Sequence, residues 1–487
     1  MESKTQNRAI KKVAVLGSGV MGSGIALHLA NIGLEVLLLD IVPFDLKEEE
    51  KANPKLRNRI VNDAFSFALK SKPAQAYSAA SAARVTLGNF DDDMPKIKDC
   101  DWIIEVVIER LDIKQQVFEK VDKLRKPGTL VTSNTSGIPI HLMAEGRSED
   151  FQKHFCGTHF FNPPRYLRLL EIIPTAKTDQ SVVDFLMHYG DVFLGKETVL
   201  CKDTPAFIAN RVGVYAMAKV FQLTQELGLT IEEVDALTGP AIGRPKTGTF
   251  KLSDLVGNDT GTKVMMGIKE NCPNDEQAGA FEVPAYVQFL LDNKFFGNKS
   301  KKGYYYKDEK RNSFSLRLDT LQYEPTGKPK FASLDASKKV EGLNDKINAF
   351  IKGDDKGAQL VKRSLAGLFA YVSNRVPEIS DVLYAVDDAL RAGFAWEIGP
   401  FQYWDIVGVQ KGIELAEADG LAISAWVKEF VAAGNTSFYK VENGLKKYYD
   451  QASKSYKTIP AAESFIILDN LRGNRPVWKN SGGTLHD

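Results

Sequence analysis

The sequence is poor in several residues that would mark a specialised class of protein. Its 487 residues include only four cysteines and six histidines, and the formal net charge is +1. The cysteines lie far apart and form no C-x-x-C pair, which argues against a disulfide framework and against the common zinc motifs. A nearly neutral chain also gives no reason to expect nucleic acid or a polybasic membrane anchor as a partner.

Long apolar runs are missing as well. No stretch approaches 18 consecutive apolar residues, and residues 1–10 contain no apolar signal core. We therefore expect a cytoplasmic protein with no membrane span. The composition, with 44% apolar and 26% charged residues, is typical of an ordinary globular protein, and the length predicts about three domains.

Short apolar runs alternate with helical patterns in the first part of the chain. Each run is long enough for a buried parallel strand and too short for a helix. The alternation predicts an α/β domain with a doubly wound, Rossmann-type parallel sheet. The segment 44–83, which is polar and rich in Ala, Lys and Glu, is expected to form a helical arm. The predicted strands are residues 13–16, 34–40, 102–108 and 128–133.

A glycine-rich turn follows the first predicted strand. Its sequence, G17-S-G-V-M-G22, has the spacing G-x-G-x-x-G and opens a helical pattern. Gly17 permits a tight turn, Gly19 lets the backbone approach a pyrophosphate, and Gly22 allows close packing of helix on strand. The N–H groups of the first helical turn, at Val20 and Met21, then bind phosphate together with the helix dipole. A glycine-rich turn without a ligand is the alternative.

The second predicted strand ends in an acidic residue, Asp40, 18 residues after Gly22. A carboxylate there can accept both ribose hydroxyls of a dinucleotide and would repel a 2′-phosphate. No arginine follows it that would bind such a phosphate, because Ile41 and Val42 come next. The sequence therefore predicts NAD, in preference to NADP, as the cofactor.

A second polar feature lies in the stretch G157-T-H-F-F-N-P-P-R-Y-L-R-L-L-E-I-I-P-T175. His159 and Glu171 lie six residues on either side of Arg165, which belongs to a polar turn between two apolar runs. If the runs are neighbouring strands, equal offsets from the turn bring the two side chains close together. An imidazole oriented by a carboxylate can act as the base that removes a hydroxyl proton. An ordinary polar pair at the margin of a sheet is the alternative.

Beyond residue 205 helical periodicity dominates, and a pattern recurs. F250-K-L-S-D-L-V-G257 and F401-Q-Y-W-D-I-V-G408 share F-x-x-x-D-x-V-G. Upstream, Val234-Asp235 is matched by Val386-Asp387, and Glu226 and Glu378 each precede their Asp by nine residues. Recurrence in register predicts a duplicated helical domain, and chance repetition of common helix residues is the alternative.

These segments together resemble the 3-hydroxyacyl-CoA dehydrogenase family of fatty-acid β-oxidation, in the long form with a duplicated helical domain that is the dehydrogenase part of multifunctional proteins. The resemblance covers about residues 10–306, and its repeat extends to about 410. The matching segments occur in the family's order. They are G17–G22, E105-V-V-I-E109, S133-N-T-S136, T158-H-F-F-N-P163 with Glu171, K202-D-T-P-A-F-I-A-N-R211 and N298-K-S-K-K-G-Y-Y-Y306.

The resemblance implies roles for single residues. His159 would be the general base and Glu171 its partner, while Ser136 and Asn210 would bind the reacting oxygen or the base. Asn162 would position the thioester of the substrate. Glu109 and Lys114, with Ser136, would line the nicotinamide side of the cofactor site. The alternatives without a functional role are a turn residue for Asn162, a helix cap for Ser136 and a solvated helix charge for Lys114.

The resemblance also implies a domain plan. An NAD-binding domain at 1–204, with its arm at 44–83, is followed by a helical domain at 205–306. A linker at 307–345 leads to a second, degenerate helical copy at 346–440, and 441–487 is a tail that leads to a missing domain. The fold expected is thus an α/β Rossmann-type domain followed by two tandem all-α copies.

The substrate and partners follow from the same resemblance. An acyl-CoA thioester is the expected substrate, and an enoyl-CoA hydratase domain or partner is expected to accompany the chain. Single-copy relatives dimerise through the helical domain, so a tandem copy predicts a monomer. Two departures stand out: the first copy has the basic loop G243-R-P-K-T-G-T-F250 where relatives have G-P-F, and the second copy has Lys362 in the place of Asn210. A dehydrogenase of another small hydroxy acid and a redox-silent NAD-binding protein remain alternatives.

Overall fold

The computed structural model describes residues 8–442, 445–460, 476–480 and 482–486. The chain divides into two compact units, Met1–Phe207 and Ile208–Asp487, so the boundary lies three residues beyond the one predicted. In the part of the chain that the structure describes, no helix is both long and apolar enough to cross a bilayer.

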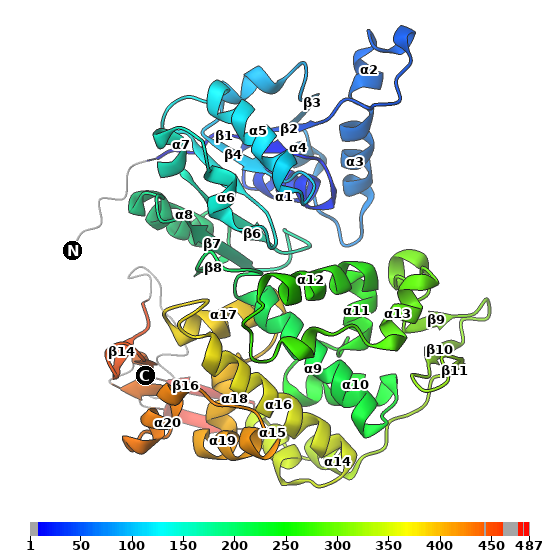
Figure 1. Ribbon diagram of the computed structural model, residues 1–487, viewed down its shortest axis with the longest axis vertical. Helices are drawn as coiled ribbons and strands as arrows, with labels where there is room; N and C mark the ends of the chain where they lie inside the picture. Colours follow the sequence, from blue (N-terminus) through cyan, green and yellow to red (C-terminus); the bar gives the residue numbers. More distant parts are fainter. Residues whose placement is uncertain (1–7, 443–444, 461–475, 481, 487) are drawn as a thin grey trace. The chain divides into compact units, whose positions relative to one another are not determined.

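The first unit is built on an eight-stranded sheet with the order β3-β2-β1-β4-β5-β6-β7-β8 (Figure 1). All neighbouring strands are parallel except β6 and β7, which are antiparallel and joined by a short loop. The strands are β1 Lys12–Leu16, β2 Glu35–Asp40, β3 Val85–Asn89, β4 Trp102–Glu105, β5 Leu130–Ser133, β6 Phe155–Phe160, β7 Leu169–Pro174 and β8 Glu197–Leu200. The predicted doubly wound α/β domain is confirmed.

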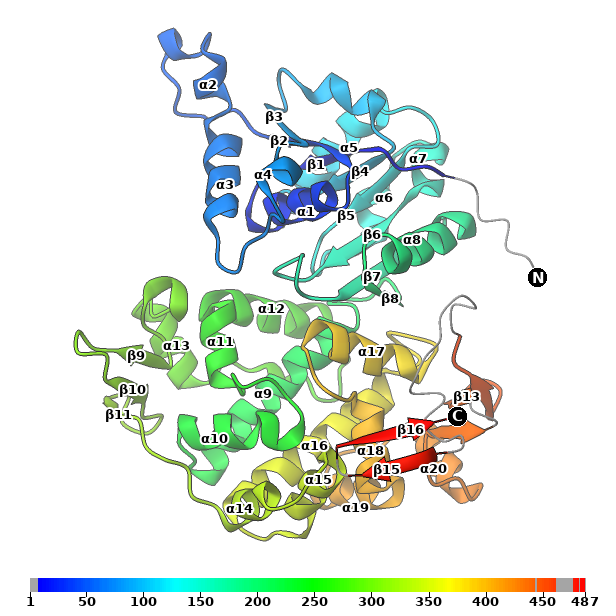
Figure 2. The ribbon, with the colours of Figure 1, turned by 180° about the vertical axis from the view of Figure 1, so that it is seen from behind.

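Apolar side chains cover both faces of this sheet, because successive residues of a strand point to opposite sides. Val13 and Val15 of β1 belong to a core cluster with residues of α1, α3 and α8, and Ala14 and Leu16 between them are buried as well. Figure 2 gives the opposite view of this unit. Its helices are α1 Val20–Asn31, α2 Pro54–Arg57, α3 Arg59–Lys70, α4 Ala79–Ala82, α5 Leu111–Leu124, α6 Ile140–Ala144, α7 Glu149–Lys153 and α8 Gln180–Val192.

The second unit is mainly helical, as the periodicity beyond residue 205 predicted. Its longest helices, α9 Ala209–Leu227 and α16 Lys356–Arg375, pack against each other. The ring of Tyr215 in α9 stacks on that of Tyr371 in α16, with centroids 3.8 Å apart. The other helices are α10 Ile231–Leu237, α11 Phe250–Val256, α12 Asn258–Asn271, α13 Ala285–Asp292, α14 Ala332–Lys338, α15 Leu343–Lys352, α17 Leu383–Gly393, α18 Pro400–Val407, α19 Val409–Ala418 and α20 Ala425–Ala432.

The duplication is visible in the hydrogen bonds. The carboxylate of Asp235 accepts N–H groups at the start of α11 and the hydroxyl of Tyr305 at 2.8 Å. The carboxylate of Asp387 accepts N–H groups at the start of α18 and the hydroxyl of Tyr439 at 2.6 Å. The two aspartates that the repeat matched therefore make corresponding contacts in the two copies, and Asp235 accepts one further N–H, from Thr249.

The prediction of a linker at 307–345 is wrong. This segment contributes to a three-stranded antiparallel sheet, β9 Tyr305–Lys307, β10 Ser313–Leu316 and β11 Tyr323–Pro325, and then forms α14. Although its composition is polar and lysine-rich, this region contains a small aromatic cluster. In this cluster Tyr306 stacks on Phe314 and meets Tyr323 edge-on. Leu316 and Leu334 are buried.

The predicted tail also carries regular structure where it is described. A three-stranded sheet consists of β12 Tyr439–Glu442, β13 Leu445–Asp450 and β14 Ser455–Thr458, and a hairpin consists of β15 Pro476–Asn480 and β16 Gly483–His486. Residues 443–444, 461–475, 481 and 487 of the tail lie outside the described residues. That the tail leads to a further domain stays a prediction.

Candidate functional site

In the glycine-rich turn between β1 and α1, packing within the protein leaves no room for a side chain at two glycines but leaves room at the third. Gly17 has φ +109°, and a Cβ there would lie 2.5 Å from the carbonyl oxygen of Val106. A Cβ on Gly22 would lie 1.8 Å from the carbonyl oxygen of Gly17. A Cβ on Gly19 would meet nothing within 4 Å. Since the chain itself leaves Gly19 free to carry a side chain, the space beside it fits the close approach of a phosphate group.

Asp40 lies at the end of β2, beside this turn. Its Oδ2 accepts the backbone N–H of Ser18 at 2.6 Å and the Ser18 hydroxyl at 2.5 Å, and its Oδ1 accepts the N–H of Ile41 at 2.7 Å. The carboxylate is therefore oriented by the first turn, where Val20 is 65% exposed and Met21 is partly buried. Oδ1, which accepts one hydrogen bond, retains a lone pair for a ribose hydroxyl.

Lys114 of α5 is buried rather than a solvated helix charge, so that alternative is wrong. Its ammonium lies 2.8 Å from Glu105 Oε1 and 3.3 Å from Glu109 Oε2, and the Lys114 side chain is only 1% exposed. Glu105 also accepts the hydroxyl of Ser133 at 2.5 Å and the N–H of Val107 at 2.6 Å. The ion pair joins α5 to the ends of β4 and β5.

Glu109 is the outer member of this cluster. Its Oε1 accepts the hydroxyl of Thr135 at 2.5 Å and the N–H of Ser136 at 2.9 Å. Burial alone would raise the pKa of Glu109, but the Lys114 ammonium and these hydrogen bonds outweigh burial and hold it below its ordinary value. Glu109 is therefore a stable anion in the loop after β4.

The segment after β5 is fixed by its own side chains. Asn134 accepts the N–H of Phe160 at 2.8 Å, so it supports β6 one residue beyond His159. Thr135 accepts the N–H of Ile138 at 3.1 Å. Ser136 does not cap a helix, because α6 begins at Ile140 with Pro139 as its N-cap. Its hydroxyl makes no hydrogen bond to any residue that the structure describes, and it is partly exposed.

His159 and Glu171 are cross-strand partners on β6 and β7, as the equal offsets from the turn predicted. The Nδ1 atom of His159 lies 2.7 Å from Glu171 Oε2, and the residues are 4% and 0% exposed. A buried carboxylate on Nδ1 fixes the imidazole tautomer, so that Nε2 is the nitrogen that can take a proton. The arrangement therefore leaves Nε2 as the ring nitrogen that is available for proton transfer.

The loop between β6 and β7 holds Asn162 at its start, exposed and followed by a cis peptide to Pro163. Lys196, which the sequence did not single out, donates to the carbonyl oxygens of Pro164 and of Leu167, the latter at 2.8 Å. Burial lowers the pKa of Lys196 to about 8. The loop is thereby tied to the segment before β8.

Arg165 ties the same loop to the end of the helical arm. Its guanidinium donates to the carbonyl oxygens of Ala74 and Ala76 at 2.6 and 3.2 Å and lies 4.3 Å from the ring centre of Tyr77. The hydroxyl of Tyr166 donates to Ala74 at 2.8 Å. The arm predicted at 44–83 therefore carries α2, α3 and α4 and ends against the loop that follows His159.

Asn210 belongs to the second unit, near the start of α9. It is partly buried, and its predicted role beside His159 stays a prediction. The basic loop 243–250 of that unit packs against the second copy: the Arg244 guanidinium lies 3.9 Å from the ring centre of Trp396, and Gly243 accepts the N–H of Glu397 at 2.8 Å. Arg244 of the basic loop therefore stacks on an aromatic ring of the second copy.

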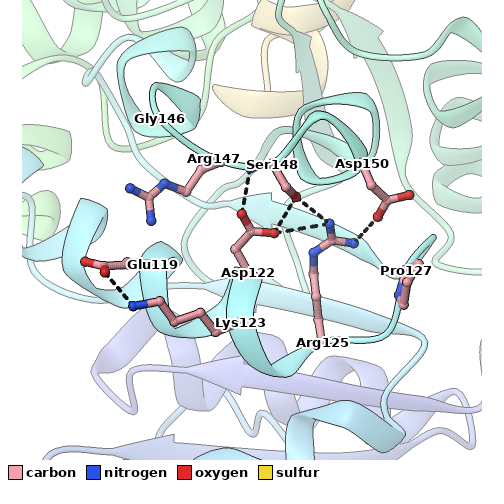
Figure 3. A pocket seen from close by; sticks show the side chains of 9 residues that line it. All are labelled: Glu119, Asp122, Lys123, Arg125, Pro127, Gly146, Arg147, Ser148 and Asp150. Atoms are coloured by element: carbon pink, nitrogen blue, oxygen red, sulfur yellow. Dashed lines mark hydrogen bonds and ion pairs between the residues drawn. The ribbon is translucent and has the colours of Figure 1, made fainter.

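The cavity in Figure 3 contains none of the predicted site residues. It is lined near the end of α5 by a network in which Arg125 contacts Asp122 at 3.3 Å and Asp150 at 2.6 Å. Ser148 donates to Asp122 from both its N–H and its hydroxyl. These ion pairs join α5 to α7 and have a structural role.

Comparison with known proteins agrees with this geometry. A model of the 3-hydroxyacyl-CoA dehydrogenase NAD-binding domain matches residues 12–204, and one of the 3-hydroxyacyl-CoA dehydrogenase C-terminal domain matches residues 207–307. A probable 3-hydroxyacyl-CoA dehydrogenase of Bacillus subtilis (strain 168) is 44% identical over 99% of this chain and 61% of its own length.

Two further relatives share parts of the chain. A probable 3-hydroxyacyl-CoA dehydrogenase of Deinococcus radiodurans is 46% identical over 62% of this chain and 84% of its own length. A putative fatty acid oxidation complex trifunctional enzyme of Rickettsia felis is 30% identical over 95% of this chain and 60% of its own length. The chain thus spans about three fifths of the length of the Bacillus and Rickettsia relatives.

Proposed function

Because this chain belongs to the 3-hydroxyacyl-CoA dehydrogenase family, we propose that it oxidises (3S)-3-hydroxyacyl-CoA to 3-ketoacyl-CoA in fatty-acid β-oxidation. The observation that carries the proposal is the buried contact between His159 Nδ1 and Glu171 Oε2 at 2.7 Å. The oxidation of a secondary alcohol needs a base at the hydroxyl, and an imidazole held by a carboxylate supplies one.

In the proposed reaction the 3-hydroxyl proton moves to His159 Nε2 while the C3–O bond becomes a carbonyl. Glu171 stabilises the imidazolium that forms and keeps the ring in the orientation that the reaction needs. NAD, when bound, accepts the hydride from C3. Ser136 and Asn210 would hydrogen-bond the reacting oxygen, and Asn162 would position the thioester.

The cofactor would be held by the turn after β1. The space beside Gly19 fits the pyrophosphate, the N–H groups at Val20 and Met21 would bind it, and Asp40 would accept the ribose hydroxyls. Glu109, Lys114 and Ser136 would line the nicotinamide side. Lys114 would act there by holding Glu105 and Glu109, since its ammonium is occupied by both carboxylates.

We also propose that the chain is a monomer. Arg211 of α9 lies 3.3 Å from Glu378, and Arg363 of α16, 152 residues later, lies 2.8 Å from Glu226. Such reciprocal contacts are those of a two-fold, isologous interface, here made within one chain. A further domain or partner, of enoyl-CoA hydratase type, and a cytoplasmic location remain part of the proposal.

The deciding experiment measures NADH absorbance with acetoacetyl-CoA as substrate. The unmodified protein should oxidise NADH rapidly, and His159→Ala should be slower by about 100- to 10,000-fold because the general acid–base group is lost. His188→Ala, which removes an exposed histidine of α8, is the matched control and should keep full activity.

The alternatives give different results in this experiment. Equal rates for the unmodified protein and His159→Ala would discard His159 as the base. An absence of turnover in both, with NADH still bound, would favour another small hydroxy acid as substrate or a redox-silent binding protein.

A further inference from the structure

We propose that Phe207 is a positioning residue, which holds the His159 imidazole in the orientation set by Glu171. The inference rests on the proposed role of His159 as the base. Phe207 is the last residue of the first unit and is completely buried. It lies 48 residues from His159 along the chain, so only the fold brings the two rings together.

Two aromatic rings enclose the imidazole. The centroid of Phe207 lies 5.6 Å from that of His159, with the planes at 61°, and the centroid of Phe161 lies 4.5 Å away at 56°. Both phenylalanines are buried. Glu171 fixes one ring nitrogen, whereas the two phenyl rings restrict rotation of the imidazole about that hydrogen bond. Edge-on and tilted contacts of this kind are favourable between aromatic rings.

The backbone beneath Phe207 is strained. Ala206 has φ +63° and Phe207 has φ +51°, a region that residues with a side chain rarely adopt. Two such residues in succession persist only where surrounding contacts over-determine them, and strain of this kind is concentrated at functional sites. The conformation places the Phe207 ring against His159.

The segment before Phe207 is firmly anchored. Asp203 accepts the N–H groups of Ile140 and His141 at 2.7 and 2.9 Å and lies 2.7 Å from the Nδ1 of His141. The Phe207 N–H donates to the carbonyl oxygen of Thr204 at 3.1 Å. These contacts hold the turn 203–207 at the start of α6 and so maintain the strained conformation.

Misorientation of a catalytic base is costly, since a displacement of about 1 Å can reduce a rate by about 100-fold. We therefore expect Phe207→Ala to lower kcat with acetoacetyl-CoA by about 10- to 100-fold while KM for NADH stays unchanged. Phe207→Leu, which retains an apolar side chain of similar bulk, should stay within about threefold of the unmodified protein.

A second readout does not depend on turnover. The proton between His159 Nδ1 and Glu171 should give a proton NMR resonance far downfield of the amide region, and Glu171→Gln identifies it by its loss or shift. Phe207→Ala should broaden or abolish this resonance, whereas the Phe207→Leu variant should retain it. This readout tests the positioning of the imidazole even if acetoacetyl-CoA proves not to be a substrate.

Phe151→Ala is the matched control, because Phe151 is equally buried in the first unit and packs on Phe118 and Phe155 instead of on His159. It should keep both kcat and the resonance. The proposal is overturned if Phe207→Ala keeps the resonance and loses less than threefold in kcat, or if Phe151→Ala produces the same losses. Should Phe207→Ala not fold, Phe207→Val tests the same point with a smaller truncation.

Discussion

At the scale of single residues, several polar side chains of the candidate site are paired with one another. Glu105 and Lys114 form a buried ion pair that Glu109 joins from the outside, and Glu171 contacts His159. Removing one member of a buried ion pair leaves an unpaired charge in the interior, which costs more than the pair contributes.

Lys114→Met should therefore lower the free energy of unfolding by about 3–5 kcal/mol, because Glu105 would remain buried without a cation. Chemical denaturation measures the change. Lys123→Met, which removes an exposed lysine of the same helix paired with Glu119, is the control and should change stability little. Similar small losses in both variants would mean that Glu105 is neutral in the folded protein.

His28 makes the stability depend on pH. Burial, and to a lesser degree the charge of Lys196, lowers the pKa of His28 from 6.5 to about 4. Between these values the unfolded chain binds more protons than the folded chain, so this contribution to stability is present at pH 7 and is lost as the pH falls. The free energy of unfolding should therefore fall between pH 7 and pH 5, and in His28→Gln this fall should be smaller by about 2 kcal/mol.

Urea denaturation of the unmodified protein and of His28→Gln at the two pH values measures this difference. The Gln side chain can still donate to the carbonyl oxygen of Leu194, which the Nε2 of His28 meets at 3.1 Å. If the free energy of unfolding depended on pH in the same way in both proteins, protonation of His28 would not destabilise the folded state.

At the scale of elements, the two helical copies use one device to start a helix. Asp235 and Asp387 each bind N–H groups at the start of the next helix and a tyrosine hydroxyl from a following strand. A carboxylate in this place satisfies donors that would otherwise be buried without partners.

Asp235→Ala and Asp387→Ala should each lower the free energy of unfolding, by about 2–4 kcal/mol, since each variant loses a cap and leaves buried donors unsatisfied. Glu414→Ala, at an exposed carboxylate of α19, is the control. Thermal or denaturant unfolding measures the change. A large loss of stability in only one of the two variants would contradict the equivalence of the two copies.

At the scale of the whole molecule, the contact between the two copies supports the proposed monomer. α9 and α16 meet closely at Gly367, where a Cβ would lie 3.0 Å from the hydroxyl oxygen of Tyr215. In the proposed monomer, α16 of the tandem copy packs on the face of α9 that a second chain would otherwise cover.

Light scattering should give a mass of about 54 kDa for the unmodified chain. Gly367→Leu should separate α16 from α9, expose their apolar faces and lead to larger species. Gly267→Leu, at a glycine where a Cβ meets nothing within 4 Å, should remain a monomer. A dimer of unmodified chains would contradict the proposal.

Features that depend on patterns between residues close together in the chain could be predicted from the sequence. The alternating strands and helices, the glycine-rich turn, the pairing of His159 with Glu171 and the repeat all depend on local periodicity, on turn spacing or on equal offsets. The small sheet β9–β11 was missed, because three- and four-residue strands in a polar segment leave almost no periodic signal.

Contacts between residues far apart in the chain were decided only by the tertiary structure. The burial of Lys114 between two glutamates, the stacking of Arg244 on Trp396 and the packing of Phe207 on His159 join positions that no local pattern connects. The sequence thus indicated the alternating strands and helices of the first unit and the residues to which the proposed chemistry is assigned. The fold determined which charges lose water and which rings meet, since both depend on packing across the whole unit.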